Sequence, residues 1–332
     1  MTATETPPHT TLSSGRLTFR LIAPIDLGRL EADVETAIFS DEPVDPDLEG
    51  HWFESMARTG TLEGFVVLEG DRAVDHAWQR HAPWEKMPER YGRVMGDLFP
   101  PARDAARLGP IYDLIEERSR ADGTRTFTTN AREDDALKVS FLASRGYVEK
   151  RRSQRWKLDL ARHRGRLLAM AETSRARMRE QGIGLGTVDR DDDPAKFRKL
   201  HALTNETAAD APRTVPFVPD SFDEYLTMFD NPGLRPDRVW IARRGDDLVG
   251  ISMLEYPVAR GHVWTAWTGT ARSVRGRGVA RAVKLETLAQ AIGLGVEQVR
   301  TDNDGENRPI LHLNEQLGYE RIPGWLQLHR KT

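Results

Sequence analysis

The fold of this chain is decided by residues 268–289, which read TGTARSVRGRGVARAVKLETLA. A strand-like run over residues 262–270 leads there into a turn that contains Gly276 and Gly278. A helical pattern follows at once, because apolar residues recur at steps of three and four from Val279 onward. The first N–H groups of a helix lack partners within the helix, and glycine lets a large anion approach them. The turn therefore predicts a phosphate or diphosphate site. It also carries positive charge from three arginines: Arg272, Arg275 and Arg277.

Length and composition narrow the class of protein. The 332 residues suggest about two domains, and a hydrophobic share of 39% is enough for packed cores. The net charge of -3 gives no reason to expect a nucleic-acid or membrane partner. Because the chain has no cysteine, disulfides, thiol nucleophiles and cysteine–metal sites are excluded. We expect a cytoplasmic protein without a bound metal, and the composition leaves open whether it is a monomer or a homodimer.

The chain repeats itself over its two halves. FLASRGY at residues 141–147 matches LNEQLGY at residues 313–319, and a hairpin with a Gly-Asp turn recurs at nearly the same spacing. A repeat of this length indicates a duplicated domain, since solenoid repeats span roughly 20–50 residues. We expect a loose tail over residues 1–14, a first domain over 15–160, a helical linker over 161–181 and a second domain over 182–332.

A family resemblance rests on residues 268–319. RGRGVA at residues 275–280 fits the pattern Arg/Gln-x-x-Gly-x-Gly/Ala, and it stands between TGT and the later TDN and NEQLGY segments. This combination resembles the GNAT superfamily of acyl-coenzyme A N-acyltransferases. The resemblance implies a tandem α/β (α+β) architecture similar to mycothiol synthase. Each domain would have a mixed, mainly antiparallel sheet flanked by helices.

The resemblance also implies which residues bind acetyl-coenzyme A. They lie on the strand, the turn and the two segments that follow: Trp267, Thr268, Gly269, Thr270, Arg275, Gly276, Arg277, Gly278, Val279, Ala280, Asn303, Asn307 and Ile310. Gly269 is interpreted as the strand bulge of this fold, although a small residue beneath Trp264 or Trp267 would also explain it.

The first domain departs from this pattern. With Leu108 aligned to Val279, Ala105 and Arg107 replace the two glycines of the turn. Their side chains would occupy the space that a diphosphate needs. We therefore expect this domain to bind coenzyme weakly or not at all.

The implied reaction is acetyl transfer to a primary amine of a small molecule, which requires a general base. Glu255 is the first candidate for this base and His262 the second. Asn314 stands where many GNAT enzymes have a tyrosine acid, so that Tyr256 is the alternative proton donor. Glu206 and Asp210 are expected to bind cationic parts of the substrate.

A second function is also compatible with these residues. If Asn314 reflects lost chemistry, the chain is a non-catalytic acyl-coenzyme A-binding or protein-interaction module. The sequence does not identify the acceptor amine.

Overall fold

The computed structural model describes residues 11–14 and 16–332. Strand β1 (Thr11–Ser14) pairs antiparallel with β2 (Leu17–Leu21). The expectation of a loose tail is therefore wrong for residues 11–14, and the rest of that expectation lies outside the described residues.

The chain divides into two compact units that differ from the expected domains. The first unit comprises the chain up to Ala131, with Asp135–Val148 and Leu328–Thr332, and the second comprises Arg132–Asp134 and Glu149–Gln327. Strand β7 (Val148–Asp159) lies almost wholly in the second unit, where it pairs antiparallel with β12 (Gln298–Asp304). The boundaries expected at residues 160 and 181 are therefore corrected. The helix expected as a linker, α5 (Leu160–Glu180), is also part of the second unit.

The first unit is a mixed sheet with four α-helices among its described residues. Its other strands are β3 (Thr61–Glu69), β4 (Arg72–His81), β5 (Tyr91–Leu98) and β6 (Thr126–Arg132). Its helices are α1 (Pro24–Ile38), α2 (Pro46–Thr59), α3 (Ala105–Ala121) and α4 (Ala136–Ser144). The strands β2 to β5 pair antiparallel in chain order, and β5 pairs parallel with β6.

The second unit repeats this plan. Its other strands are β8 (Ile183–Thr187), β9 (Val239–Arg244), β10 (Asp247–Glu255), β11 (Val263–Thr270) and most of β13 (Glu320–Lys331), whose end from Leu328 onward belongs to the first unit. Its other helices are α6 (Lys196–Ala209), α7 (Phe222–Leu226), α8 (Val279–Gly293) and α9 (Arg308–Leu317). The strands β8 to β11 pair antiparallel, and β11 pairs parallel with β12. The predicted fold class, a mixed and mainly antiparallel sheet flanked by helices, is confirmed in both units.

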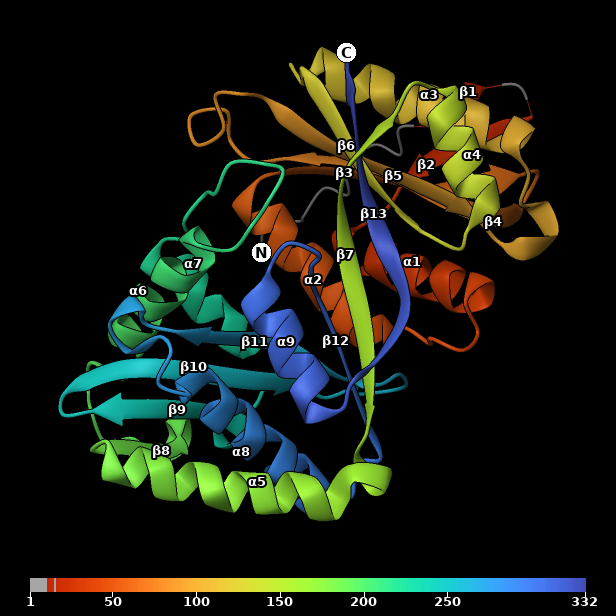
Figure 1. Cartoon of the computed structure of the whole chain (residues 1–332). Coiled ribbons are helices and arrows are strands. Elements are labelled where there is room, and N and C mark those ends of the chain that lie inside the picture. The colour runs from red at the N-terminus through yellow and green to blue at the C-terminus, as the bar shows by residue number, and fades with distance from the viewer. Residues whose placement is uncertain (1–10, 15) are drawn as a thin grey trace, which may run out of the picture. The chain divides into compact units, whose positions relative to one another are not determined.

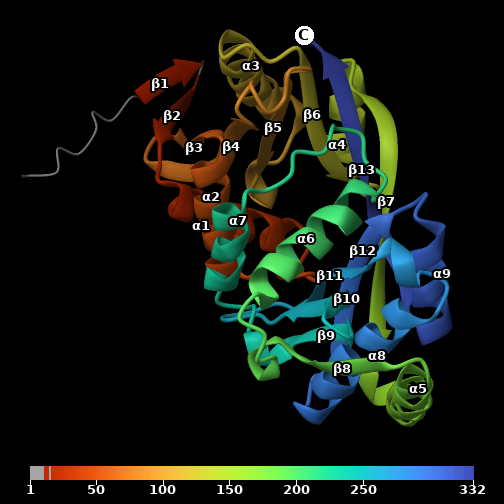
Figure 2. The same cartoon turned by 90° about the vertical axis from the view of Figure 1, so that its left-hand side faces the viewer.

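The core of the second unit lies on both faces of this sheet. Helices α6 and α8 cover opposite faces of β9, β10 and β11 (Figures 1 and 2). Leu200 and Leu203 of α6 and Val279 and Val283 of α8 are buried in one cluster with Ile251 of β10. The apolar face that begins at Val279 thus fixes where α8 starts, and with it the position of the turn before the helix.

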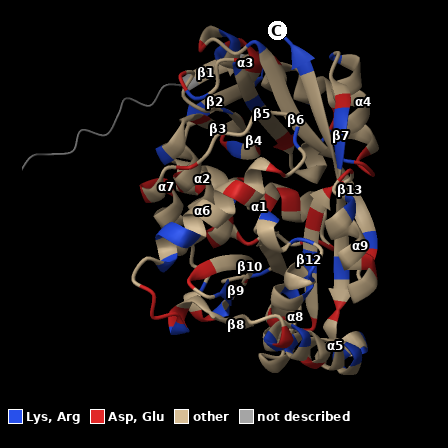
Figure 3. Ribbon diagram, turned by 60° about the vertical axis from the view of Figure 1, so that its left-hand side comes forward, with Lys and Arg blue, Asp and Glu red and all other residues tan. Residues whose placement is uncertain are grey.

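Both units carry a mixture of positive and negative side chains (Figure 3). Basic and acidic residues are interspersed over the strands and helices of each unit (Figure 3). In the described part of the chain, no helix combines the length and the apolar character that crossing a membrane would require.

Candidate functional site

The RGRG turn (residues 275–278) presents free main-chain N–H groups. Gly276 has a φ of 75° and Gly278 a φ of 89°, a left-handed conformation that side chains with a Cβ rarely adopt. Gly278 is the N-cap of α8, and no side chain of the described residues caps the helix there. The first α-helical hydrogen bond runs from Ala282 N to Gly278 O at 3.0 Å. The N–H groups of Arg275 and Arg277 donate to Arg272 O and Val274 O. Those of Gly276 and of residues 278–281 have no main-chain acceptor among the described residues and are left for an anion.

Strand β11 diverges from β12 next to this turn. The parallel pairing covers Val263 with Val299 and Trp264 with Arg300, and from there to Thr270 β11 is paired with β10 and no longer with β12. The register between β10 and β11 shifts where Met253 opposes Trp267 and Leu254 opposes Thr265. The bulge thus lies at Ala266. A bulge increases the local twist of a strand and bends it, which explains the divergence.

Gly269 is not the bulge, in contrast to our expectation. It pairs regularly with Ile251 of β10. A Cβ on Gly269 would lie 2.8 Å from Thr207 Oγ1 and 2.9 Å from Trp267 Nε1. The alternative is therefore correct: glycine is needed because Trp267 and α6 pack closely there. Thr268 Oγ1 lies 3.0 Å from Ser252 Oγ, which ties β11 to β10.

Two predicted site residues beyond the divergence contact each other. Asn314 of α9 is fully buried and donates from Nδ2 to Asn303 Oδ1 of β12 at 2.7 Å. Asn314 Oδ1 accepts no hydrogen bond from the described residues. Asn307 is the N-cap of α9, but its side chain makes no capping bond, and Ile310 packs against the core. A buried amide oxygen that no described residue satisfies has the capacity to accept a hydrogen bond from a ligand.

The candidate acid and base residues gather at the far end of β10. Glu255 is half-buried, and its Oε1 accepts a hydrogen bond from Asn231 Nδ2. Tyr256 stacks under Arg238, whose Cζ lies 4.2 Å from the ring centroid. Burial raises the pKa of Tyr256 to about 12, so that its hydroxyl is protonated at neutral pH. His262 stands directly before β11, where Glu255 opposes Trp264.

Glu206 and Asp210, at the C-terminal end of α6, bind the arginines beside the RGRG turn. Glu206 Oε1 accepts from the backbone N–H of Arg272 at 2.7 Å. Asp210 accepts from Arg272 Nε at 2.8 Å and from Arg275 Nη2 at 2.6 Å. The hydrogen bonds from Arg272 and Arg275 hold the pKa of Asp210 far below its usual range. A carboxylate at a helix C-terminus is unfavourable by itself, and here the two guanidinium groups offset it.

From the sequence, Arg272 was predicted only to add positive charge to the turn. Its pairing with Asp210, which stands 62 positions earlier, was missed. Nothing in the local pattern of either residue could have indicated it.

Among the described residues, no group of three or more His, Asp or Glu side chains could hold a metal ion.

The matching turn of the first unit is closed by a side chain. Helix α3 begins at Ala105, one turn before Leu108, whereas α8 begins at Val279. Asp104 is the N-cap, and its Oδ1 accepts from Arg107 N at 2.9 Å. A carboxylate of the chain therefore occupies the helix N-terminus that is open in the second unit.

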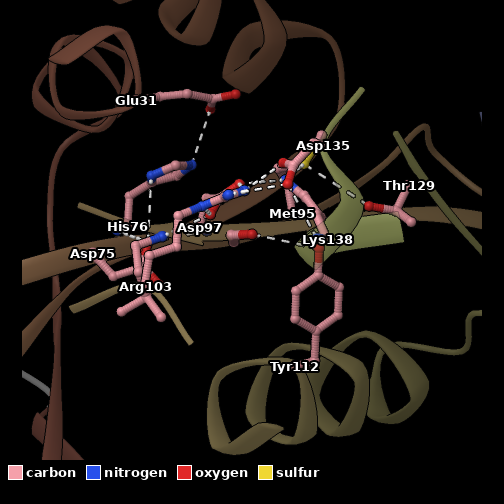
Figure 4. Close-up of polar contacts among 12 residues, drawn as sticks. Glu31, Asp75, His76, Met95, Asp97, Arg103, Tyr112, Thr129, Asp135 and Lys138 are labelled. Carbon is pink, nitrogen blue, oxygen red and sulfur yellow. Dashed lines mark hydrogen bonds and ion pairs between the residues drawn. The ribbon is translucent and has the colours of Figure 1, made fainter. Parts of the chain in front are cut away.

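Charged side chains also fill the divergence between β5 and β6 in the first unit (Figure 4). Lys138 Nζ of α4 lies 3.0 Å from Asp97 Oδ2 of β5, and Arg103 bridges Asp97 and Asp135. Burial would raise the pKa of Asp97, but Lys138 and Arg103 outweigh it and hold that pKa at about 2. The two units can be compared by counting from the first residue of each matching strand and helix. The second unit then has Gly269 in place of Asp97 and Ile310 in place of Lys138.

The repeated element order, the bulged and diverging strand and the glycine turn define the tandem GNAT fold. No model of a known protein family and no curated protein sequence matches the chain. Solved structures do match it over nearly its whole length, and the predicted tandem GNAT architecture is confirmed.

Three of these structures illustrate the likeness. A tandem GNAT protein from the clavulanic acid biosynthesis pathway has a TM-score of 0.73 at 18% identity, over 95% of this chain and 98% of that one. A GCN5-related N-acetyltransferase from Sphaerobacter thermophilus has a TM-score of 0.65 at 17% identity, over 96% of both chains. A glucosamine N-acetyltransferase region of a fungal multi-domain GH3 β-N-acetylglucosaminidase has a TM-score of 0.67 at 14% identity, over 97% of this chain and 38% of that one. At these identities the likeness establishes the fold.

Proposed function

We propose that the second unit binds acetyl-coenzyme A and transfers the acetyl group to a primary amine of a small molecule. The observation that carries this proposal is the uncapped N-terminus of α8, with Gly276 and Gly278 in left-handed conformations beside a strand that diverges from its neighbour. The N–H groups of this helix end would bind the diphosphate. Asn303, Asn307 and Asn314 would line the divergence where the arm of the coenzyme lies. When bound, the coenzyme supplies an activated acetyl thioester.

The remaining chemistry belongs to residues of the chain. Glu255 is proposed as the general base, because it is half-buried at the end of β10 and Asn231 holds its carboxylate in place through Oε1. His262 is the second candidate. Backbone N–H groups of residues 268–270 that point away from β10 would polarise the acetyl carbonyl. Asn314 keeps one N–H of its amide for the leaving sulfur, and Tyr256 is the alternative donor.

The first unit is proposed to bind no coenzyme. Its turn is capped by Asp104, and its strand divergence is filled by the ion pairs of Lys138, Asp97 and Arg103. A phosphate placed there would meet a carboxylate of like charge.

Acetyl-coenzyme A turnover with a panel of amines, followed by release of free thiol, tests the activity. Thiol release with at least one amine is the expected result. Coenzyme binding without release for any amine would favour the alternative, a non-catalytic binding or interaction module.

That Glu206 and Asp210 bind the substrate stays a prediction, and their contacts with Arg272 suggest a role at the turn instead.

Gly278→Glu tests the placement of the coenzyme. A carboxylate at this helix N-terminus should abolish binding measured by calorimetry, because it repels the diphosphate and strains the left-handed backbone. Gly293→Glu makes the same change at the other end of α8 and should bind normally. Circular dichroism separates lost binding from lost folding. Equal affinity of the two variants would contradict the placement.

A further inference from the structure

Helix α5 docks on α8 so that its C-terminal end reaches the RGRG turn. Arg175 of α5 pairs with the buried Glu286 of α8, with Nε 2.7 Å from Oε1 and Nη2 3.1 Å from Oε2. At the C-cap of α5, Gln181 Nε2 donates to Arg277 O at 3.3 Å. The two helices lie side by side in Figure 1. The segment expected as a linker between domains is therefore part of the wall around the turn.

Arg177 stands at this contact. A Cβ built on Gly278 would lie 3.7 Å from Arg177 Nη1, 3.8 Å from Cζ and 3.9 Å from Nε. Three nearly equal distances mean that the flat face of the guanidinium lies over the N-cap of α8. Its N–H donors then spread around the same helix end from which the free N–H groups of α8 point.

The charge of Arg177 lacks a partner among residues 11–14 and 16–332. Its side chain is exposed and makes no ion pair or hydrogen bond with any side chain of the described residues. The N-terminus of a helix carries a partial positive charge, so a cation placed there is repelled. By contrast, Arg272 before the turn and Arg275 in it both pair with Asp210 and share its single negative charge. Arg177, like Arg277 of the turn itself, is therefore a guanidinium that the described residues leave unpaired and ready for an external anion.

We propose that Arg177 binds a phosphate group of the coenzyme. The inference rests on the proposed function and adds a binding residue from α5 to that site. Arginine suits the role, since its planar fork donates two parallel hydrogen bonds to phosphate oxygens. The arginine holds the phosphate from the α5 side while the main chain of α8 holds it from below.

A purely structural role for Arg177 would be to stabilise α5. Arg177 and Arg179 both lie in the last turn of α5, where a cation interacts favourably with the helix dipole. Two residues apart on a helix, they point in nearly opposite directions. Arg179→Met is therefore a matched control, with the same loss of charge from the same turn of the helix.

Calorimetric titration with coenzyme A tests the proposal. Arg177→Met should bind about tenfold more weakly than wild type, the effect of one charge-assisted hydrogen-bonded contact, and Arg179→Met should stay within about twofold. Arg177→Lys should recover part of the affinity, because it keeps the charge and loses the fork. Titration with dephospho-coenzyme A, which lacks the 3′-phosphate, identifies the phosphate: a tenfold loss that persists assigns the diphosphate, and one that vanishes assigns the 3′-phosphate.

Equal affinities of Arg177→Met and Arg179→Met for coenzyme A would overturn the inference. The proposed function would still stand in that case, provided that the wild type binds. Failure of the wild type to bind coenzyme A at all would instead sink the proposed function. Matching thermal melts of the two variants show that neither has lost its fold.

Discussion

At the scale of single residues, the acidic end of α6 sets the charge of the site. Asp210 holds Arg272 and Arg275 together, and both guanidinium groups therefore face a carboxylate before any coenzyme arrives. A coenzyme phosphate at the RGRG turn would feel that carboxylate as a like charge. Asp210 thus lowers the affinity of the RGRG turn for a coenzyme phosphate, while it keeps the two arginines in place.

Asp210→Asn is predicted to tighten coenzyme A binding several-fold, because the substitution removes a negative charge from an anion site. The salt dependence of binding should become steeper, since more unpaired positive charge then faces the ligand. Calorimetry at two salt concentrations measures both effects. Asp237→Asn is the control, as Asp237 pairs with Arg235 and its loss removes the same charge from the same unit. Weaker binding of Asp210→Asn would show that ordering of the arginines outweighs their charge.

Lys284 makes the stability of the second unit depend on pH. Its side chain is buried in α8, with Nζ 4.9 Å from the ring centroid of Tyr319. Burial lowers the pKa of Lys284 from 10.5 to about 7. Between these two values the unfolded chain binds the proton and the folded chain does not. The free energy of unfolding should therefore rise with pH in this range, by about 1.4 kcal/mol per pH unit, and be lowest below pH 7.

Lys284→Met should remove this dependence, since methionine fills similar space without a charge. Urea unfolding at about pH 7 and pH 9 should show a gain in stability with pH for wild type that exceeds the gain for the variant by roughly 2–3 kcal/mol. Lys150→Met, at an exposed position of the same unit, should behave as wild type does. A wild type and a Lys284→Met variant with the same pH dependence would mean that the ammonium is solvated or paired in solution.

At the scale of elements, the sequence predicts what is local and misses what is tertiary. The RGRG turn was predictable because its glycines and the apolar face of α8 stand next to each other in the chain. The bulge was misplaced to Gly269, since a glycine signals equally a bulge or a close neighbour, and only the register shows that Ala266 is the extra residue. The pairing of Asp210 with Arg272 had no local signal at all.

The same contrast applies to α5 and β7. The basic, alanine-rich pattern of residues 161–181 predicts a helix but not the surface on which it packs. That surface is set by Arg175 meeting the buried Glu286, more than a hundred positions away. The chain order predicts β7 as the last strand of the first domain, yet β7 pairs with β12 of the second unit. Strand partners are chosen by side chains that are distant in sequence, and so the domain boundaries could not be predicted.

At the scale of the whole molecule, duplication has produced two units with different anion sites. The second unit keeps an open helix end and an open divergence between strands. The first unit has filled both, the helix end with Asp104 and the divergence with Lys138 and Asp97. In the first unit, charged side chains of the protein thus occupy the helix N-terminus and the strand divergence. The second unit has no charged side chain at the matching positions. The chain should therefore bind a single coenzyme.

Calorimetric titration should give one coenzyme A per chain, and Gly278→Glu should abolish all binding, because no second site remains in the first unit. Asp104→Ala is the informative partner variant. Loss of this N-cap should cost about 1 kcal/mol of stability, and the affinity and the stoichiometry of one should stay unchanged, since Lys138 and Asp97 still fill the divergence. A stoichiometry of two in wild type, or residual binding in Gly278→Glu that Asp104→Ala strengthens, would instead mean that the first unit keeps a working site. In that case the ion pairs of Lys138 would have to open to admit the coenzyme arm.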